Sequence, residues 1–392
     1  MNLKSVVSSK SLSALLAFVA IAILCVGVAT AQVQSQNGVT VLTVQNQPQA
    51  KLDFVNAKPM PLPAISLPAD SKQALINSLM SNPARGAAGY SSGAVGNGTL
   101  DTVDLGAPIA ANDDGIQPDD FGANAHPFST ERADLGTPTL ANATNKFYPY
   151  RAAGKLFFLI GSNTYMCSAS LIKPGIVATA AHCVANYGQS QFYTGWQFIP
   201  GYRNGVAPYN ISTAASAWVL TKYYNGTDNC YVYGVVCPDD VAVIALNYKP
   251  GSKIFVGKNT GFYGYGWDGY GFSGTLTHIS QMGYPAGLDY AAYMERNDSY
   301  GYTDATFSNN TVIGSNMDGG SSGGPWLVNF GKDPVLTGET NGSFPANNTV
   351  VGVTSWGYTD KSYKEQGAAP FTSGNIVVLV NAACGSYPAQ CK

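Results

Sequence analysis

The chain has 392 residues and a formal net charge of −2, and only 11% of its residues are charged, against about 25% in an average soluble protein. So weakly charged a chain offers no basic surface for a polyanion, which excludes a nucleic-acid partner. Hydrophobic residues make up 45% of the sequence, enough for a substantial core in two or three domains, or in one large domain with a tail.

Residues 1–31 have the pattern of a secretory signal peptide. Two lysines give a positive start, residues 12–28 are almost wholly apolar, and Ala29 and Ala31 form the small-x-small pattern of a signal peptidase site. The alternative is an uncleaved membrane anchor, but the apolar run is shorter than the roughly 20 residues that a spanning helix needs. We therefore expect a secreted or periplasmic protein that has no stable membrane association after cleavage.

Residues 32–144 differ in composition from the rest of the chain. Only one of the 24 tyrosines lies before residue 145, and all five tryptophans follow it. The segment is rich in Pro, Gly, Asp and Ala and has little hydrophobic periodicity, so it would bury too little apolar surface to fold alone. Its one helical pattern runs from Asp70, a suitable N-cap, to Met80. We expect a propeptide or a semi-ordered, poorly structured extension.

From residue 145 onward, short apolar runs alternate with turns rich in Gly, Asn and Tyr. Runs of this length and spacing are typical of strands in a β-barrel or sandwich. The clearest runs are residues 154–160, 166–172, 241–246, 275–282 and 350–356. Residues 374–384 have the pattern of a short C-terminal helix. The sequence therefore predicts an all-β domain over residues 145–392.

Six cysteines remain once the signal peptide is removed, and an even number in an exported chain predicts disulfides. Six cysteines allow 15 connectivities, so spacing alone does not decide between them. They fall into three neighbouring pairs, which we expect to be bonded: Cys167 with Cys183, Cys230 with Cys237, and Cys384 with Cys391. Because the sequence has no C-x-x-C motif and three histidines in all, we expect no metal site.

His182 is the best candidate for a general base. It follows an apolar run in the sequence TAAHCV, at the end of a predicted strand, and the neighbouring Cys183 can tie this turn to Cys167. A general base has to be held rigidly. His126 precedes a proline in the poorly structured extension. His278 lies in an alternating, strand-like run, which favours a structural role for it.

A histidine base needs an acid that fixes its tautomer, and a nucleophile needs backbone N–H groups aimed at the oxyanion. Asp239 and Asp240 come just before a strongly apolar strand, where a carboxylate can be half buried. Ser321 and Ser322 lie in GGSSGGPW, residues 319–326, whose glycines permit unusual backbone angles. A flexible loop is the alternative, but a buried strand is predicted directly after this stretch.

The motifs TAAHC, DVAV and GSSGGP, in the order His, Asp, Ser, resemble those of the chymotrypsin-like serine peptidases over about residues 145–392. The stretches YPYRAAGKLFF and CSASLIKPGIVATAAHCV resemble the bacterial branch that includes the glutamyl endopeptidases. The resemblance implies two six-stranded antiparallel β-barrels with a short C-terminal helix. It also implies a monomeric endopeptidase that hydrolyses protein or peptide substrates and needs no cofactor.

The resemblance also assigns roles by position. Ser322 matches the nucleophile, and His182 matches the general base that later acts as the acid. Asp240 matches the orienting carboxylate, since Asp239 is one position too early for the motif. The N–H groups of Gly320 and Ser322 match the oxyanion hole. The strand that pairs with the substrate backbone matches Ser355, Trp356 and Gly357.

Several positions depart from the family pattern. Ser321 stands where the trypsin branch has an aspartate that pairs with a newly formed N-terminus, so we expect removal of the extension to unblock the site or to end assisted folding. Asn316 stands where trypsin-like enzymes carry the aspartate that selects Lys and Arg. No histidine follows His278 to hold a glutamate side chain. Together with Met317, Asn316 indicates a neutral pocket without a preference for Lys or Arg.

Two other classes of protein are alternatives to a secreted serine endopeptidase. A non-catalytic binding protein of the same fold usually lacks a triad residue, whereas all three are present here. An esterase of the α/β-hydrolase type would use the motif G-x-S-x-G, which residues 320–324 fit. That fold orders its triad Ser, Asp, His, and no histidine follows Ser322. The inactive binding protein is therefore the main alternative.

Overall fold

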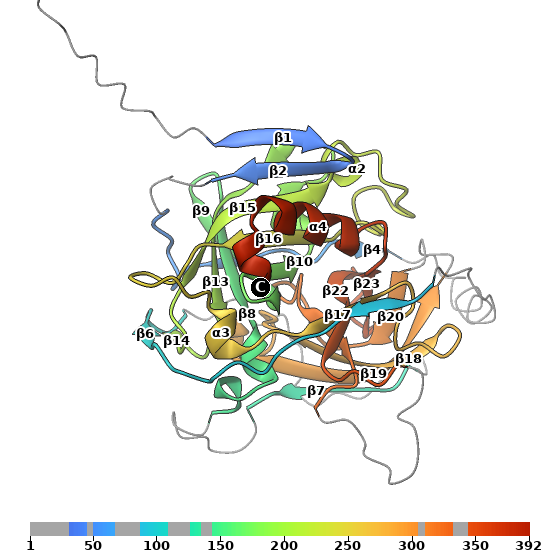
Figure 1. Ribbon diagram of the computed structural model, residues 1–392. Coiled ribbons are helices and arrows are strands. Elements are labelled where there is room, and N and C mark those ends of the chain that lie inside the picture. The colour runs from blue at the N-terminus through green and yellow to red at the C-terminus, as the bar shows by residue number, and fades with distance from the viewer. Residues whose placement is uncertain are drawn as a thin grey trace, which may run out of the picture.

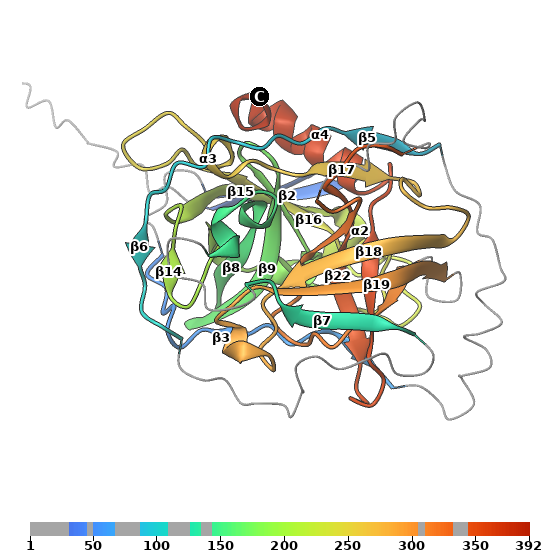
Figure 2. The same ribbon diagram turned by 90° about the horizontal axis from the view of Figure 1, so that it is seen from below.

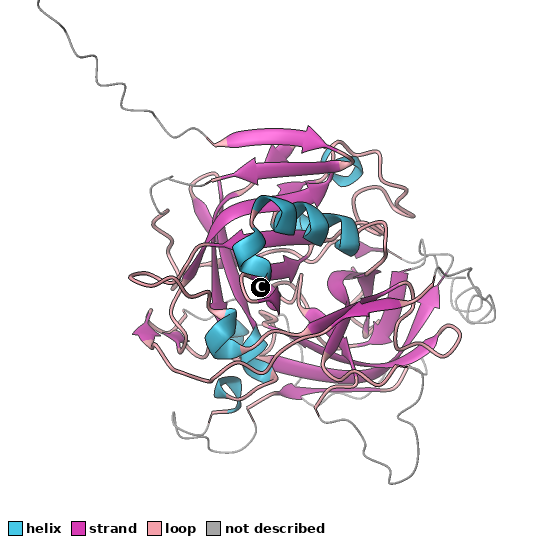
Figure 3. Cartoon of the chain, in the orientation of Figure 1, coloured by secondary structure: helices cyan, strands magenta, loops and turns pink. Residues whose placement is uncertain are grey.

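The computed structural model describes residues 31–44, 50–66, 87–108, 126–134, 143–304, 310–331 and 344–392. The expected signal peptide, apart from its last residue, and the expected helix from Asp70 to Met80 lie outside these ranges. Strands make up most of the regular structure in the described chain, and the helices are short (Figure 3). This agrees with an all-β domain.

The first barrel is a closed cylinder of six antiparallel strands. It closes because β15 pairs with β16 on one side and with β13 on the other. Its strands form where the chain has continuous apolar runs, and all five residues of β16 are buried, as expected for strands that face a closed core. In barrel order the strands are β15 (Ser212–Leu220), β13 (Thr194–Pro200), β8 (Ala153–Ile160), β9 (Asn163–Lys173), β10 (Ile176–Thr179) and β16 (Ala242–Leu246).

The second barrel is built in the same way from the C-terminal half of the chain. It closes through the pairing of β21 with β22, and all ten residues of β22 are buried. The two barrels lie side by side in Figure 2, with β8, β9 and β15 in one and β18, β19 and β22 in the other. In barrel order the strands are β21 (Pro325–Val328), β18 (Leu276–Gly283), β19 (Glu295–Asp304), β20 (Asn310–Gly314), β23 (Glu365–Pro370) and β22 (Thr349–Tyr358).

The described parts of the extension add short strands to both barrels. β2 pairs antiparallel with β15 and β7 with β19, while β3 and β4 pair in parallel with β9 and β22. β5 pairs with β17, which follows the first barrel in sequence and joins β22. The strands are β1 (Gln32–Gln36), β2 (Val39–Thr43), β3 (Lys58–Pro59), β4 (Ala64–Ile65), β5 (Gly89–Ser91), β6 (Val103–Asp104), β7 (Phe128–Arg132) and β17 (Gly264–Trp267).

The C-terminal helix α4 (Ile376–Ser386) lies across the first barrel (Figure 1). The Asn375 side chain accepts a hydrogen bond from the Ile376 N–H and so caps the helix start. The apolar side chains of Ile376, Leu379 and Val380 are buried. In the part of the chain that the structure describes, no helix is both long and apolar enough to cross a membrane.

The remaining elements are short and connect the barrel strands. They are η1 (Thr144–Lys146), η2 (Tyr150–Ala152), η3 (Ala181–Cys183), β11 (Ala185–Asn186), β12 (Gln191–Phe192), β14 (Val206–Ala207), α2 (Thr221–Tyr224), α3 (Gly257–Thr260), η4 (Asp289–Ala291) and η5 (Pro388–Cys391). Of these, η3 matters most for function, because it carries His182.

Candidate active site

His182 and Asp240 form a buried pair at one end of the first barrel. His182 lies in η3 directly after β10, and Asp240 lies just before β16, which pairs with β10. One carboxylate oxygen of Asp240 accepts the His182 backbone N–H at 2.8 Å, and the other lies 2.7 Å from the ring Nδ1. A carboxylate at Nδ1 fixes the tautomer with its proton on that nitrogen. The Nε2 atom is then left as a proton acceptor.

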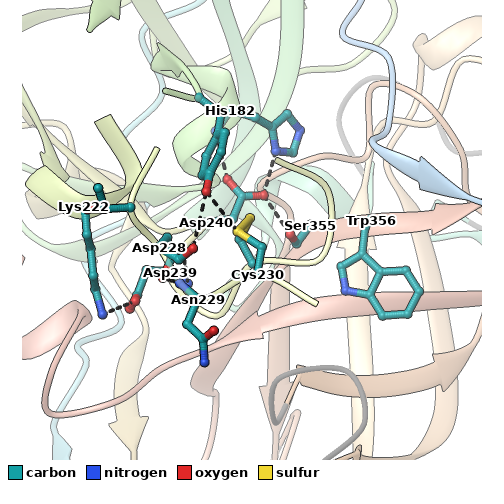
Figure 4. Close-up of a disulfide and its surroundings, with 12 residues drawn as sticks. His182, Lys222, Asp228, Asn229, Cys230, Asp239, Asp240, Ser355 and Trp356 are labelled. Carbon is teal, nitrogen blue, oxygen red and sulfur yellow. Dashed lines mark hydrogen bonds and ion pairs between the residues drawn. A yellow bond between two sulfur atoms is a disulfide. The ribbon is translucent and has the colours of Figure 1, made fainter. Parts of the chain in front are cut away.

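Ser355 supplies a third hydrogen bond to the same carboxylate. Its hydroxyl donates to Asp240 at 2.6 Å, so a residue of β22 in the second barrel holds the acid of the first (Figure 4). Sequence motifs placed Ser355 on the substrate strand and gave no sign of this contact. The neighbouring Trp356 side chain is fully buried and donates to Asn310. Trp356 therefore anchors the strand, and its ring is not free to contact a substrate.

Ser322 lies in a tight turn immediately before β21. Gly320 has a φ of +93°, and a side chain there would collide with the Tyr284 carbonyl, so the turn requires glycine. The Ser322 hydroxyl and His182 Nε2 are both buried, and neither has a hydrogen-bond partner within the described ranges. Catalytic hydrogen bonds are often long before substrate binds. Both atoms are thus uncommitted to other groups.

Ser321, the other serine of the motif, is occupied elsewhere. Its hydroxyl donates to the Asp318 carbonyl at 2.6 Å, and Gln366 donates to it at 3.4 Å. The side chain is fully buried. These contacts give Ser321 a structural place in the turn and leave Ser322 as the serine whose hydroxyl has no competing partner.

Contacts between β9 and the serine turn join the two barrels at the site. The backbone N–H of Ser168 donates to the Ser322 carbonyl at 2.8 Å, and the Ser168 hydroxyl donates to the Gly320 carbonyl at 2.9 Å. The disulfide Cys167–Cys183 links β9 to η3. One strand thus holds both the turn of the candidate nucleophile and the helical turn of the candidate base. Sequence analysis did not identify Ser168.

All three disulfides join cysteines that are neighbours in sequence, as the spacing favoured. Besides Cys167–Cys183, the structure has Cys230–Cys237 and Cys384–Cys391. Two clusters of described residues have the composition of metal ligands, one around His182 and one around Asp228. Each contains both sulfurs of one of these disulfides, and a disulfide has no thiolate to offer a metal.

Asp239 belongs to a separate group of charges. It makes an ion pair with Lys222, and its backbone N–H donates to Asp228. Burial raises the pKa of the Asp228 carboxyl to about 7, and the nearby charge of Asp239 adds to this shift. Figure 4 shows the Asp239 side chain directed to Lys222 and the Asp240 side chain directed to His182 and Ser355. The two neighbouring carboxylates therefore have different partners.

A cavity of about 310 Å³ lies between the serine turn and β22. Its wall includes Asn316, Met317 and Gly357, which the sequence assigned to substrate binding, and also Lys361 and Lys364. Lys364 donates to the Asn316 side-chain oxygen at 2.9 Å. Asp318 and Glu365 line the cavity as well, so its wall carries charges of both signs. The expectation of a neutral pocket did not foresee these charged side chains, because nothing in the motifs relates residue 364 to residue 316.

Two closed six-stranded antiparallel barrels define the chymotrypsin-like class of folds, and the buried His–Asp pair and the serine turn meet where the barrels join. Residues 143–376, more than half of the chain, match the Trypsin family. The chain therefore belongs to the trypsin family of serine endopeptidases, whose members act on proteins or peptides.

Two curated relatives are similar to parts of the chain. A glutamyl endopeptidase of Bacillus licheniformis is 31% identical over 153 residues, which cover 38% of this chain and 42% of the relative. An extracellular metalloprotease of Bacillus subtilis strain 168 is 31% identical over 133 residues, which cover 32% of this chain and 36% of the relative. The chain thus spans about two fifths of the length of these relatives.

Among solved structures, the chain resembles the protease Anisep from Arthrobacter nicotinovorans. The two share 24% sequence identity with a TM-score of 0.47, over 62% of this chain and 97% of that chain.

Proposed function

We propose that the protein is a secreted serine endopeptidase in which Ser322 is the nucleophile, His182 the general base and Asp240 the orienting acid. The arrangement of His182 carries the proposal. Its Nδ1 is held by a carboxylate that has two further hydrogen bonds, while its Nε2 has no partner in the described chain. A histidine in this state can accept a proton from a serine hydroxyl.

In the proposed reaction, His182 Nε2 takes the proton as Ser322 Oγ attacks the substrate carbonyl carbon. The N–H groups of Gly320 and Ser322 bind the oxygen that becomes negative. His182 then gives its proton to the leaving nitrogen, the C–N bond breaks, and an acyl-enzyme remains. Water attacks the acyl-enzyme by the same steps and releases the acid. Asp240 stabilises the imidazolium of His182, which forms both in the acylation step and in the hydrolysis of the acyl-enzyme.

One lysine in the wall of the pocket supports a preference for substrates with an acidic residue before the scissile bond. The two acids of the wall are bound to other groups, Asp318 to the Gly287 N–H and Glu365 to His126. Lys364 lines this pocket and donates a hydrogen bond to the Asn316 side chain. The relative from Bacillus licheniformis is a glutamyl endopeptidase. In this chain a lysine would bind the carboxylate in place of the absent histidine. Secretion is supported by the N-terminal pattern and by three disulfides. We also expect a monomer, as the family resemblance implies.

The test of the triad is the pair of variants Ser322→Ala and Ser321→Ala. We expect Ser322→Ala to lower kcat by about 10⁶, because the attacking oxygen is removed. Ser321→Ala should change kcat far less, because that hydroxyl is bound to Asp318. Near-normal turnover by Ser322→Ala would refute the assignment. A parent chain that fails to turn over substrate even after limited proteolysis would favour the inactive binding protein.

A further inference from the structure

Residues 58–65 of the extension, here called the crossing segment, lie across the candidate active site. Its first strand, β3, pairs with β9 of the first barrel, and its last strand, β4, pairs with β22 of the second. Backbone hydrogen bonds of 2.9 Å join Met60 to Met166, Pro63 to Gly357, and Ile65 to Thr359. The crossing segment thus spans both walls of the site.

The crossing segment also contacts groups that the reaction needs. The N–H of Gly320, one of the two proposed oxyanion donors, donates to the Met60 carbonyl at 3.0 Å. Pro61 and Leu62 line the same cavity as Asn316 and Met317. A peptide substrate has to bind Gly320 and the edge of β22, so it cannot bind until this segment moves.

The direction of the crossing segment is opposite to that of a productive substrate. His182 protonates the leaving nitrogen, so the leaving, C-terminal half of a substrate lies toward η3 and the attached strand β9. The acyl, N-terminal half then lies along β22 beside the side-chain pocket. A substrate therefore runs from β22 to β9, whereas the crossing segment runs from β9 to β22.

The sequence of the crossing segment favours tight binding of the segment to the cleft. Prolines occupy positions 59, 61 and 63, and each fixes φ near −65°, so the segment is already extended and loses little entropy on binding. Ile65 is buried in a cluster with Trp356 and Tyr358. This side chain anchors the segment at a point outside the catalytic groups.

We propose that the crossing segment is a built-in inhibitor that closes the peptidase by lying backwards in its substrate cleft. The reversed direction keeps the leaving nitrogen away from His182, so the segment blocks the site and is not cut there. This inference rests on the proposed function, since it identifies what regulates the same site.

The test compares the full chain with two of its variants, Ile65→Asp and Val33→Asp. Ile65→Asp places a carboxylate in a buried apolar cluster and should release the segment, whereas Val33 is 47% exposed in β1 of the same extension. The readouts are the rate at which a fluorophosphonate labels Ser322 and the rate of hydrolysis of a short fluorogenic peptide, both on chains of verified intact mass. We expect both rates to rise at least tenfold in Ile65→Asp only.

Equal rates in the parent and Ile65→Asp, with both chains active, would overturn the inhibitor and leave the peptidase intact. If no chain reacts even after limited proteolysis, the proposed function itself is wrong. Leu62→Arg, at a half-buried position over the cavity, provides a second release variant that does not depend on folding with Asp at position 65. Release by neither variant would also contradict the inhibitor.

A synthetic peptide of residues 56–67 tests the reversed direction. Added to the Ile65→Asp chain, it should inhibit hydrolysis competitively and remain uncut by mass spectrometry. A peptide of the same residues in the opposite order is the control and should inhibit at least tenfold less. Cleavage of the native-order peptide within residues 58–65 would show that it binds as a substrate, and the reversed arrangement would be wrong.

Discussion

Replacing Asp240 by Asn should abolish most of the catalytic rate without disturbing the fold. One carboxylate oxygen accepts the His182 backbone N–H, while the other faces the ring Nδ1 and the Ser355 hydroxyl. An amide oxygen will keep the bond to the backbone N–H, because only an acceptor fits there. The NH₂ group then faces Nδ1 and forces the ring proton to Nε2. His182 in this tautomer cannot accept the proton of Ser322.

The expected loss in kcat is about 10⁴, which corresponds to roughly 5 kcal/mol of transition-state stabilisation. The matched control is Asp239→Asn, the same change at the adjacent residue. Asp239 is buried and pairs with Lys222, and not with His182. Loss of its charge should therefore affect stability more than the chemical step. We therefore expect less than a tenfold change in kcat for Asp239→Asn.

The assay is the initial rate of peptide hydrolysis at saturating substrate, with circular dichroism as a check that each variant is folded. A larger loss for Asp239→Asn than for Asp240→Asn would show that the wrong carboxylate has been assigned. If the Asp240→Asn protein keeps kcat within tenfold of the parent, His182 does not act through this carboxylate, and the reasoning from the hydrogen bonds is refuted.

Two further predictions concern specificity and pH. Lys364→Gln should lower the ratio of kcat/KM for Glu over Gln substrates about tenfold or more, because it removes a charge-assisted contact. The control is Lys253→Gln, at an exposed lysine that does not line the cavity, and an equal loss there would contradict a specific role. The pKa of Asp228 is about 7 in the folded protein and about 3.9 when unfolded, so the folded state binds the extra proton and stability should fall as pH rises from 4 to 7. Urea unfolding should show this fall, about 2 kcal/mol after allowance for screening, in the parent and not in Asp228→Asn.

The long buried strands and the C-terminal helix could be predicted from the sequence, because the apolar character of their residues indicates that they are buried. The run 241–246 corresponds to β16 and is apolar at every position, and the run 350–356 lies within β22 and contains three valines and a tryptophan. Helix α4 begins within two residues of the expected start at 374. The prediction of two closed barrels rested on the family resemblance, because the sequence of a single strand does not show which strands it pairs with.

The strands of the extension and the position of Lys364 at the pocket could not be predicted from the sequence, because both depend on contacts between segments that lie far apart in the chain. β5 is Gly89–Ser91 and β3 is Lys58–Pro59, and both are too short for a periodic pattern. Each forms because a strand distant in sequence, β17 for β5 and β9 for β3, offers backbone hydrogen bonds. The alternating prolines at 59, 61 and 63 indicate extended backbone, but nothing in them indicates the site that they cross. Lys364 reaches Asn316 only through the folding of the second barrel.

The most direct test of the account is the intact mass of the protein after reaction with a fluorophosphonate probe, measured before and after limited proteolysis. After proteolysis we expect a single adduct on the parent and on Ser321→Ala, and none on Ser322→Ala. An adduct that persists in Ser322→Ala, or a parent chain that stays unlabelled after proteolysis, would contradict the claim that Ser322 is an activated nucleophile.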